Sequence, residues 1–457
     1  MNTTAIVLAA GQGTRMKSDL PKVLHKANGK SLIDHVLGNI AAAGISEQIV
    51  ILGHKSEQIV QSLPQNCLIA YQYEQKGTGH AVMQAAPLLE KAQGDVLVIC
   101  GDTPLISPRT LQNLHALHQE KKAAVTVLSA IAPNPFGYGR IIRDNDRVIA
   151  IVEQKDATVT EALIKEINAG TYFFDRQFLL ENLPKLKNDN AQGEYYLTDL
   201  LALAVEAHLP TAALIADFDE IMGVNNRLQL AMAQKYLTQR KLEQLMLDGV
   251  TIINPDNCYV EEDVQVLNDT ILWPGTVLKG KTVIGSGCEI GPEVEVNDST
   301  IGNECHIKNT VINESKIGNL CNIGPFAYLR PGTVLADKVK IGDFVEVKKS
   351  TIAEGSKVPH LSYIGDATLG KRVNIGCGTI TCNYDGKNKF PTTIGDDAFI
   401  GSNSNLVAPI TISEGAFIAA GATVTENVPP FSLAINRAPF VVKEGWVLKK
   451  RQKEQNQ

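Results

Sequence analysis

The stretch "IGDDAFIGSNSNLVAPITISEGAFIAAGATV", Ile394 to Val424, carries an aliphatic residue at every sixth position. The residues at this spacing are Ile394, Ile400, Leu406, Ile412, Ile418 and Val424. An α-helix cannot use a period of six, because successive members would be scattered around its 3.6-residue turn. A parallel β-helix can, since each hexad supplies one short strand and a corner, and three hexads close a turn. The stretch therefore predicts a coil of short parallel strands with the aliphatic side chains inside.

A second run with the same spacing extends from Ile317 to Val347. Its members are Ile317, Ile323, Leu329, Leu335, Ile341 and Val347, and shorter pairs occur at Ile284 with Ile290 and at Leu369 with Ile375. Two segments interrupt the pattern, "KVPHLSYIGDAT" (357–368) and "TCNYDGKNKFPTT" (381–393). Because a regular coil has no need of these interruptions, we expect the function of the coil to lie there.

The first half of the chain alternates short β-rich runs with helical ones. The clearest strand candidates are "TAIVLAA" (4–10), "QIVIL" (48–52), "DVLVICGD" (95–102) and "AAVTVLSA" (123–130), and "SLIDHVLGNIAAAG" (31–44) has helical spacing. This alternation predicts an α/β domain with a largely parallel sheet. The Pro-free run 225–249, rich in Leu, Gln and Lys, predicts a long connecting helix. We therefore expect a domain at 1–225, a linker helix at 226–249 and a coil domain at 250–457.

Composition limits the partners of this chain. Its 457 residues exceed one ordinary core, and a formal net charge of -6 argues against nucleic acid as a partner. We find neither a secretory leader nor a bilayer-length apolar run, so we expect a cytoplasmic protein without a membrane partner. The eight cysteines are scattered without zinc-ligand spacing, and we expect free thiols. The tail "KKRQKEQNQ" (449–457) is expected to be disordered.

A glycine turn follows the first strand candidate, in "LAAGQGTRMKSDLPKVLH" (8–25). It does not match the dinucleotide fingerprint GxGxxG, because Met16 occupies the third glycine position. Backbone N–H groups of such a turn can approach phosphate oxygens, and Arg15 and Lys22 supply cations just beyond it. The run resembles the signature of sugar nucleotidyltransferases, LAAGxGTRM followed by PK. The resemblance implies that Leu8, Ala9, Ala10 and Gly11 wrap the triphosphate of UTP, with Arg15 and Lys22 on its phosphates.

Further segments resemble this family in the same order along the chain. "QYEQKGTGHA" (72–81) corresponds to the segment that reads the pyrimidine base, and "CGDTPL" (100–105) places an aspartate at a strand end. The resemblance implies base contacts from Gln72, Gly77 and Thr78, and sugar contacts from Gly139, Glu153, Asn168 and Asn225. It also implies Mg²⁺ on Asp102 and Asn225, which fits the preference of that ion for oxygen ligands. Such a site would let a sugar 1-phosphate attack the α-phosphorus of UTP by positioning and charge neutralisation.

The coil half carries a candidate base in its first interruption, His360. An isolated histidine is more often structural than catalytic. However, "GPFAYLRPG", "VEVKKS", "HLSYIGD", "NIGCGTITCNYDG" and "GSNSNLVAP" resemble bacterial bifunctional N-acetylglucosamine-1-phosphate uridyltransferase/glucosamine-1-phosphate acetyltransferases, over nearly the whole chain. This resemblance implies a Rossmann-like α/β nucleotidyltransferase domain, a long α-helix, and a left-handed parallel β-helix of hexapeptide repeats. It makes His360 the general base that deprotonates the glucosamine amine as it attacks acetyl-CoA.

The same resemblance implies three groups of binding residues in the coil. Those for glucosamine 1-phosphate are Arg330, Lys348, Tyr363 and Asn374, and we add Lys389 for its charge alone. Those that close around the acetyl group are Asn383 and Tyr384, and those on the coenzyme A side are Cys377, Ser402, Ala420 and Arg437. Cys377 stands where many relatives carry alanine. We therefore expect acetyl transfer to be retained, but the thiol should make it sensitive to alkylating or oxidising agents.

The sequence thus predicts an enzyme of UDP-N-acetylglucosamine synthesis with acetyl-CoA and UTP as co-substrates. Glucosamine 1-phosphate is acetylated in the coil, and N-acetylglucosamine 1-phosphate is then uridylated in the first domain. The family implies a homotrimer and a role in supplying cell-wall peptidoglycan and lipopolysaccharide synthesis. Two alternatives stay open at this point: a monofunctional nucleotidyltransferase whose coil is a trimerising or regulatory scaffold, and a coil that serves as a protein-binding platform.

Overall fold

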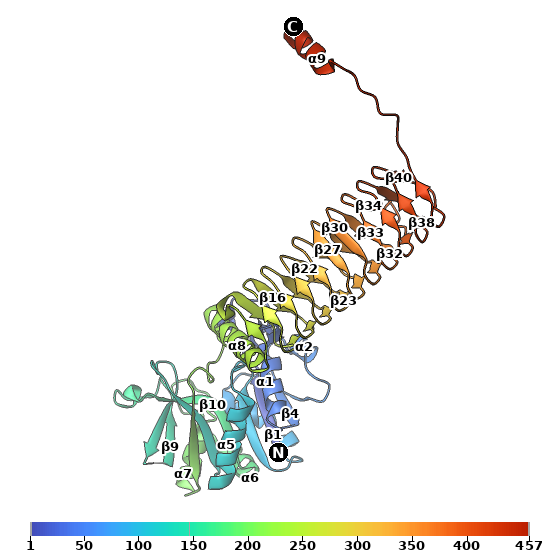
Figure 1. Ribbon diagram of the computed structural model, residues 1–457. Helices are drawn as coiled ribbons and strands as arrows, with labels where there is room; N and C mark the ends of the chain where they lie inside the picture. The colour runs from blue at the N-terminus through green and yellow to red at the C-terminus, as the bar shows by residue number, and fades with distance from the viewer. Residues whose placement is uncertain (1, 146, 456–457) are drawn as a thin grey trace. The chain divides into compact units, whose positions relative to one another are not determined.

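The computed structural model describes residues 2–145 and 147–455. The chain forms two compact units, Met1–Gln239 and Arg240–Gln457. Figure 1 shows an α/β arrangement in the first and a coil of short strands in the second. Both predicted fold classes are therefore present, in the predicted order.

The sheet of the first unit has the strand order β11-β7-β10-β6-β1-β4-β5. The strands are β11 (Thr211–Ala216), β7 (Val125–Ile131), β10 (Glu166–Phe174), β6 (Asp95–Cys100), β1 (Thr3–Ala9), β4 (Glu47–Leu52) and β5 (Leu68–Tyr71). All neighbours on this path pair in parallel except β10, which is antiparallel to both β6 and β7. A hairpin of β8 (Arg140–Asp144) and β9 (Arg147–Val152) branches from β10. The largely parallel sheet is confirmed, and β1 lies where the strand order changes direction, the usual place for a ligand in open α/β sheets.

Helices cover both faces of this sheet, because its strands bury side chains in both directions. On β1, Ala5 and Val7 belong to a core with α1 (Leu32–Ala42) and α5 (Pro108–Lys121), whereas Ile6 belongs to the opposite core. The opposite core includes α3 (Thr78–Met83), α4 (Ala86–Leu89), α6 (Arg176–Asn182) and α7 (Asp199–Glu206). A fully buried strand reads as a continuous apolar run, which is what "AIVLA" is.

The coil consists of three sheets of parallel strands, with eleven, ten and nine strands in the described residues. The eleven-stranded sheet runs from β12 (Thr251–Ile252) to β41 (Leu433–Ala434), and the others begin at β13 (Cys258–Val260) and β14 (Gln265–Val266). The six aliphatic residues from Ile394 to Val424 lie on strands that visit the three sheets in turn, and all six are buried. The parallel β-helix predicted from the period of six is confirmed.

Helix α8 (Arg227–Leu247) lies between the sheet and the coil, as predicted. Ala233 and Leu237 of α8 pack in the first unit, and Leu242 and Leu245 belong to the core of the coil. The tail differs from expectation, since α9 (Trp446–Gln455) is helical, although it buries none of its residues. Within the described residues, no helix combines the length and the apolar character needed to cross a membrane.

Candidate active sites

The ends of β1 and β6 bring together four of the predicted nucleotide-site residues. The Lys22 ammonium donates hydrogen bonds to Asp102 Oδ2 and, at 3.2 Å, to Asn225 Oδ1. Arg15 Nη2 donates to the same Asn225 Oδ1 at 2.9 Å. Two cations, a carboxylate and an amide that lie up to 210 positions apart in the sequence thus form one connected cluster.

Short backbone contacts place these side chains. The N–H of Gly101 bonds the Leu8 carbonyl at 2.9 Å, and the N–H of Val224 bonds the Asp102 carbonyl at 2.9 Å. Gly13 has φ +64°, and a Cβ there would lie 2.6 Å from Lys22 Cβ. Glycine is required at this turn because the chain must pass this close to the lysine.

The oxygens of Asp102 and Asn225 fit a divalent cation. Both accept from one ammonium, so they already converge on a single cationic centre. Carboxylate and amide oxygens are hard ligands of the kind that Mg²⁺ takes, and Mg²⁺ commonly uses only one or two protein ligands beside substrate phosphates. No cluster of three or more His, Cys, Asp or Glu suited to a metal occurs in the described part of the chain.

The predicted base-reading residues lie beside the loop before α3. Gln72 is buried, and its Nε2 donates to the Gly77 carbonyl at 3.0 Å and contacts His80 Nδ1 at 3.1 Å. Thr78 Oγ1 accepts from the Leu197 N–H at 3.2 Å. Sequence reasoning missed Gln75, whose Nε2 donates to the Ala10 carbonyl at 2.6 Å and so ties this loop to the phosphate loop.

The predicted sugar-side residues Gly139, Glu153 and Asn168 are also neighbours. The Asn168 N–H bonds the Gly139 carbonyl at 2.9 Å, and a Cβ on Gly139 would lie 3.2 Å from Glu153 Oε1. Asn168 is fixed at both ends, because its Nδ2 donates to Tyr172 OH at 2.6 Å and its Oδ1 accepts from the Gly170 N–H at 3.0 Å. Burial, with Asp156 and Asp199 nearby, raises the pKa of Glu153.

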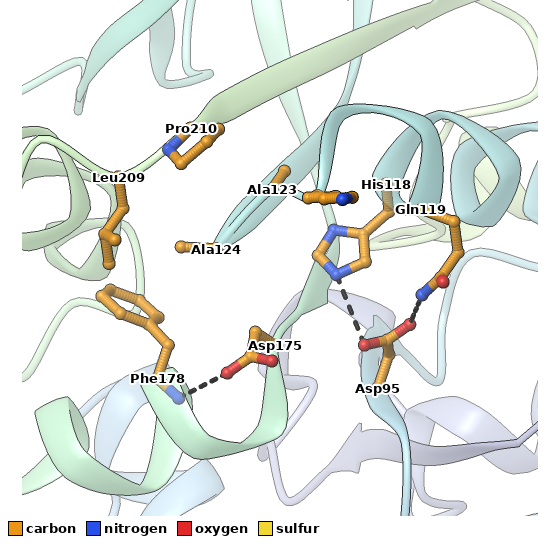
Figure 2. A pocket seen from close by; sticks show the side chains of 10 residues that line it. Asp95, His118, Gln119, Ala123, Ala124, Asp175, Phe178, Leu209 and Pro210 are labelled. Atoms are coloured by element: carbon orange, nitrogen blue, oxygen red, sulfur yellow. Dashed lines mark hydrogen bonds and ion pairs between the residues drawn. The ribbon is translucent and has the colours of Figure 1, made fainter.

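A separate cavity of about 400 Å³ opens at the other end of β6 (Figure 2). Asp95 and His118 line it, and Figure 2 shows Gln119 bonded to the same carboxylate. The Nε2 atoms of His115 and His118 lie 3.2 and 3.6 Å from the oxygens of Asp95. None of the predicted site residues lines this cavity.

In the coil, predicted catalytic and coenzyme A residues follow the strand ends of one sheet. His360 ends β30 (Lys357–His360), while Cys377, Ser402 and Ala420 follow β33 (Asn374–Ile375), β36 (Phe399–Ile400) and β39 (Phe417–Ile418). The Cys377 carbonyl accepts from the Asn403 N–H, and the Ser402 carbonyl from the Gly421 N–H, both at 2.7 Å. Arg437 Nη2 donates to the Ala420 carbonyl at 3.2 Å, which brings this residue to the same row.

Two predicted sugar-phosphate residues, Lys348 and Tyr363, and the predicted acetyl-side residue Asn383 lie around Asp366 on the neighbouring sheet. Lys348 Nζ lies 3.8 Å from Asp366 Oδ2, and Asn383 Nδ2 donates to the same oxygen and, at 3.4 Å, to Tyr363 OH. Lys389, which we included for its charge alone, joins this group, because the nearby Lys348 lowers the pKa of Lys389.

Three further predicted residues of the coil make other contacts or lie on another sheet. Arg330 Nη1 bonds Glu346 Oε1 at 2.7 Å, and Tyr384 OH bonds the Gly386 carbonyl at 2.6 Å within its own hairpin. Asn374 begins β33, on the same sheet as β30, the strand that ends at His360. Sequence reasoning missed the carboxylates Asp343, Glu346 and Asp366.

Known proteins resemble this chain over its whole length. A protein of Carboxydothermus hydrogenoformans is 52% identical over 444 residues, 97% of this chain and 99% of the relative. Proteins of Trichlorobacter lovleyi and Staphylococcus haemolyticus are each 51% identical, over 98% of this chain and 99% and 100% of theirs. All three are named "Bifunctional protein GlmU".

The chain belongs to the GlmU family.

Family models divide this GlmU-family chain as the structure does. The nucleotidyl transferase model matches residues 4–243, the GMPPB C-terminal domain model matches 254–345, and the hexapeptide repeat of succinyl-transferase matches 391–426. These matches confirm the predicted nucleotidyltransferase domain and the left-handed hexapeptide β-helix that follows it. They also confirm the resemblance to the bifunctional family. The GlmU-family chain is a transferase that acts on nucleotide and acyl-CoA substrates.

Proposed function

We propose that this enzyme makes UDP-N-acetylglucosamine in two steps at two sites. Acetyl-CoA acetylates glucosamine 1-phosphate in the coil, and UTP then uridylates N-acetylglucosamine 1-phosphate in the first domain, with release of pyrophosphate. The observation that carries this proposal is the presence of two separate polar clusters in one chain. One joins Arg15, Lys22, Asp102 and Asn225, and the other, in the coil, joins Lys348, Tyr363, Asp366 and Asn383.

The uridyl step requires two anionic reactants to meet in line. The turn of Leu8, Ala9, Ala10 and Gly11 offers its backbone to the triphosphate of UTP, and Arg15 and Lys22 neutralise phosphate charge. Mg²⁺, held by Asp102 and Asn225, would supply further charge neutralisation on the phosphates. Gln72, Gly77 and Thr78 orient the base, while Gly139, Glu153, Asn168 and Asn225 orient the sugar.

The acetyl step forms a C–N bond and breaks a C–S bond. His360 takes a proton from the amine as the amine nitrogen attacks the thioester carbon, and coenzyme A leaves as the thiol. Arg330, Lys348, Tyr363, Asn374 and Lys389 hold the amino sugar phosphate. Asn383 and Tyr384 close around the acetyl group, and Cys377, Ser402, Ala420 and Arg437 line the coenzyme A side.

The assembly and location belong to the same proposal. The His360 side chain is 58% exposed in one chain, which supports completion of the site by a neighbouring copy in a homotrimer. The eight free cysteines support a cytoplasmic location. The product would supply cell-wall peptidoglycan and lipopolysaccharide synthesis. A scaffold or a protein-binding platform has no use for the cations gathered around Asp366, so the observations favour an active coil over both alternatives.

The test is thiol release from acetyl-CoA by the full chain, given glucosamine 1-phosphate without UTP. We expect His360→Ala to lower this release by about 10² to 10⁴ fold, while uridyl transfer from UTP to N-acetylglucosamine 1-phosphate persists. His306→Ala is the matched control, because His306 is equally exposed and lies 3.5 Å from Glu289 on the same sheet. Wild-type protein that folds and transfers uridyl groups but releases no thiol would reduce the coil to a scaffold.

A further inference from the structure

The candidate base His360 has a carboxylate partner one turn earlier in the coil. His360 Nδ1 lies 2.7 Å from Asp343 Oδ1. The two residues are in register in the parallel pair of β27 (Lys340–Asp343) and β30. The pairing of β27 with β30 extends to Asp343, whereas the pairing of β24 (Asn322–Ile323) with β27 stops at Ile341. The local strand geometry therefore holds the carboxylate against the imidazole.

A close approach of the two strands permits this pairing. A Cβ at residue 342 would lie 1.8 Å from the Pro359 carbonyl oxygen, so only glycine fits there. The Leu361 N–H bonds the Asp343 carbonyl at 2.9 Å, and Ser362 Oγ donates to the His360 carbonyl at 2.8 Å. The backbone on both sides of the imidazole is thus fixed to its neighbours.

The coil itself does not require a carboxylate at this position. Asp343 immediately precedes a corner residue in the left-handed conformation, Phe344, as His360 precedes Leu361. The residues that hold the same place at the corners of this sheet are Pro274, Pro292, Lys308, Pro325, Asp343, His360, Cys377, Ser402 and Ala420. Asp343 is the one acid among them, and it stands in the turn directly before the histidine.

The protonation of Asp343 decides which imidazole nitrogen is free. The hydrogen bond with His360, with the Asp343 N–H and the charge of Lys340, keeps the pKa of Asp343 below its usual value. The carboxylate is therefore ionised at neutral pH and can only accept, so Nδ1 of a neutral His360 must carry the proton. Nε2 then presents its lone pair away from Asp343.

We infer that Asp343 is a positioning residue for acetyl transfer, which orients His360 and holds its Nε2 ready to accept the proton of the attacking amine. This inference rests on the proposed acetyl transfer in the coil. Asp343 touches no reacting atom, and it acts through His360 alone. Its carboxylate also stabilises the imidazolium that forms when the amine proton arrives.

The first test replaces Asp343 by asparagine in the full chain, Asp343→Asn. We expect kcat for acetyl transfer to fall by about 10 to 100 fold, with the KM for both substrates within about twofold, because Asp343 does not bind them. A residue that only supports the coil would not lower kcat while leaving both KM values unchanged.

The control and a second variant keep the result decisive. Asp397→Asn removes another exposed carboxylate of the coil, one that pairs with Arg372 at 2.6 Å, and it should change neither kcat nor KM for acetyl transfer. Asp343→Ala should regain part of its acetyl transfer when acetate is added, which a misfolded variant would not do. An unchanged kcat in Asp343→Asn, or no acetate rescue of a slow Asp343→Ala, would overturn the inference. Absence of acetyl transfer in the wild type would instead overturn the proposed function on which it rests.

Discussion

The two candidate sites of this chain are built in opposite ways. The uridyl site collects Arg15, Lys22, Asp102 and Asn225 from loops that the sheet topology brings together once. The acetyl site places His360, Cys377, Ser402 and Ala420 at equivalent corners of successive turns. In the first, the single ammonium of Lys22 joins Asp102 to Asn225; in the second, two lysines, Lys348 and Lys389, lie beside one another. We therefore expect the loss of one lysine to be more severe in the first site than in the second.

A pair of lysine substitutions tests this contrast directly and has the largest effect expected after that of His360→Ala. Lys22 is the ammonium shared by Asp102 and Asn225, so Lys22→Met should lower kcat/KM for uridyl transfer by about 10² to 10³ fold. Lys348 has Lys389 beside it, so Lys348→Met should lower kcat/KM for acetyl transfer only by about 10 fold. Steady-state kinetics of both half-reactions measures the two effects.

The exposed Lys338, which pairs with Glu354 on the coil, supplies the control Lys338→Met and should affect neither reaction. The double variant Lys348→Met/Lys389→Met should reach the severity of Lys22→Met. Equal losses in the two single variants would contradict the contrast between the sites.

Asp95 and its partners His115 and His118, at the other end of β6 from the uridyl site, test how the first unit is stabilised (Figure 2). Burial alone would raise the pKa of Asp95, but its hydrogen bonds with His115 and His118 outweigh burial and leave the pKa well below the usual range. Asp95→Asn should cost the first unit about 1 to 3 kcal/mol in free energy of unfolding at pH 7. Uridyl transfer activity followed through urea unfolding measures this cost, with exposed Asp189→Asn as the control.

The pH dependence of that cost has a definite sign. The pKa of Asp95 in the folded state lies below its unfolded value of about 3.9. The stabilisation is therefore complete above the unfolded pKa and is lost as pH falls toward the folded pKa. The difference between wild type and Asp95→Asn should shrink when unfolding is measured at about pH 3.5 instead of pH 7. A constant difference would show that Asp95 acts through packing and not through its charge.

The smallest expected effect concerns the half-exposed thiol of Cys377, at the corner proposed to line coenzyme A. Maleimide on Cys377 should lower acetyl transfer, because the adduct occupies the row shared with Ser402 and Ala420. Acetyl-CoA should protect against it, and Cys377→Ala should be active and resistant. Unchanged acetyl transfer with Cys377 demonstrably labelled would show that this corner tolerates bulk.

Local patterns in the sequence predicted much of this molecule. The period of six identified the buried residues of the coil, because the inward-facing residue of each hexad can be recognised from the local sequence alone. The glycine turn before Lys22 was recognisable for the same reason. The antiparallel direction of β10 left no local sign, since strand direction depends on the connections around a strand. The helix in the tail was also missed, because a charged segment that buries no residues can be exposed to solvent whether it is helical or disordered.

Partner residues were harder to predict than the residues they serve. Asp343 and Asp366 are acids in a coil with many surface acids, and nothing in their own segments distinguishes them. The signal that could have found Asp343 is its separation of 17 positions from His360, nearly three hexads and thus one turn. Turn lengths vary in this coil, however: Ser402 stands 25 positions after Cys377 because a hairpin closed by Tyr384 and Lys389 intervenes. The register had to be observed before the pair could be identified.

The coil has a further consequence for how such an enzyme can change over time. Each strand bonds only to the equivalent strands one turn before and one turn after it. Whole turns between α8 and β25 (Tyr328–Leu329) can therefore be duplicated or deleted without altering any contact among the acetyl-site residues. Each such event would move the acetyl site along the coil axis by one strand spacing, about 4.8 Å. Evolution can therefore change the length of the early coil in steps of one turn without altering the contacts of the proposed acetyl site.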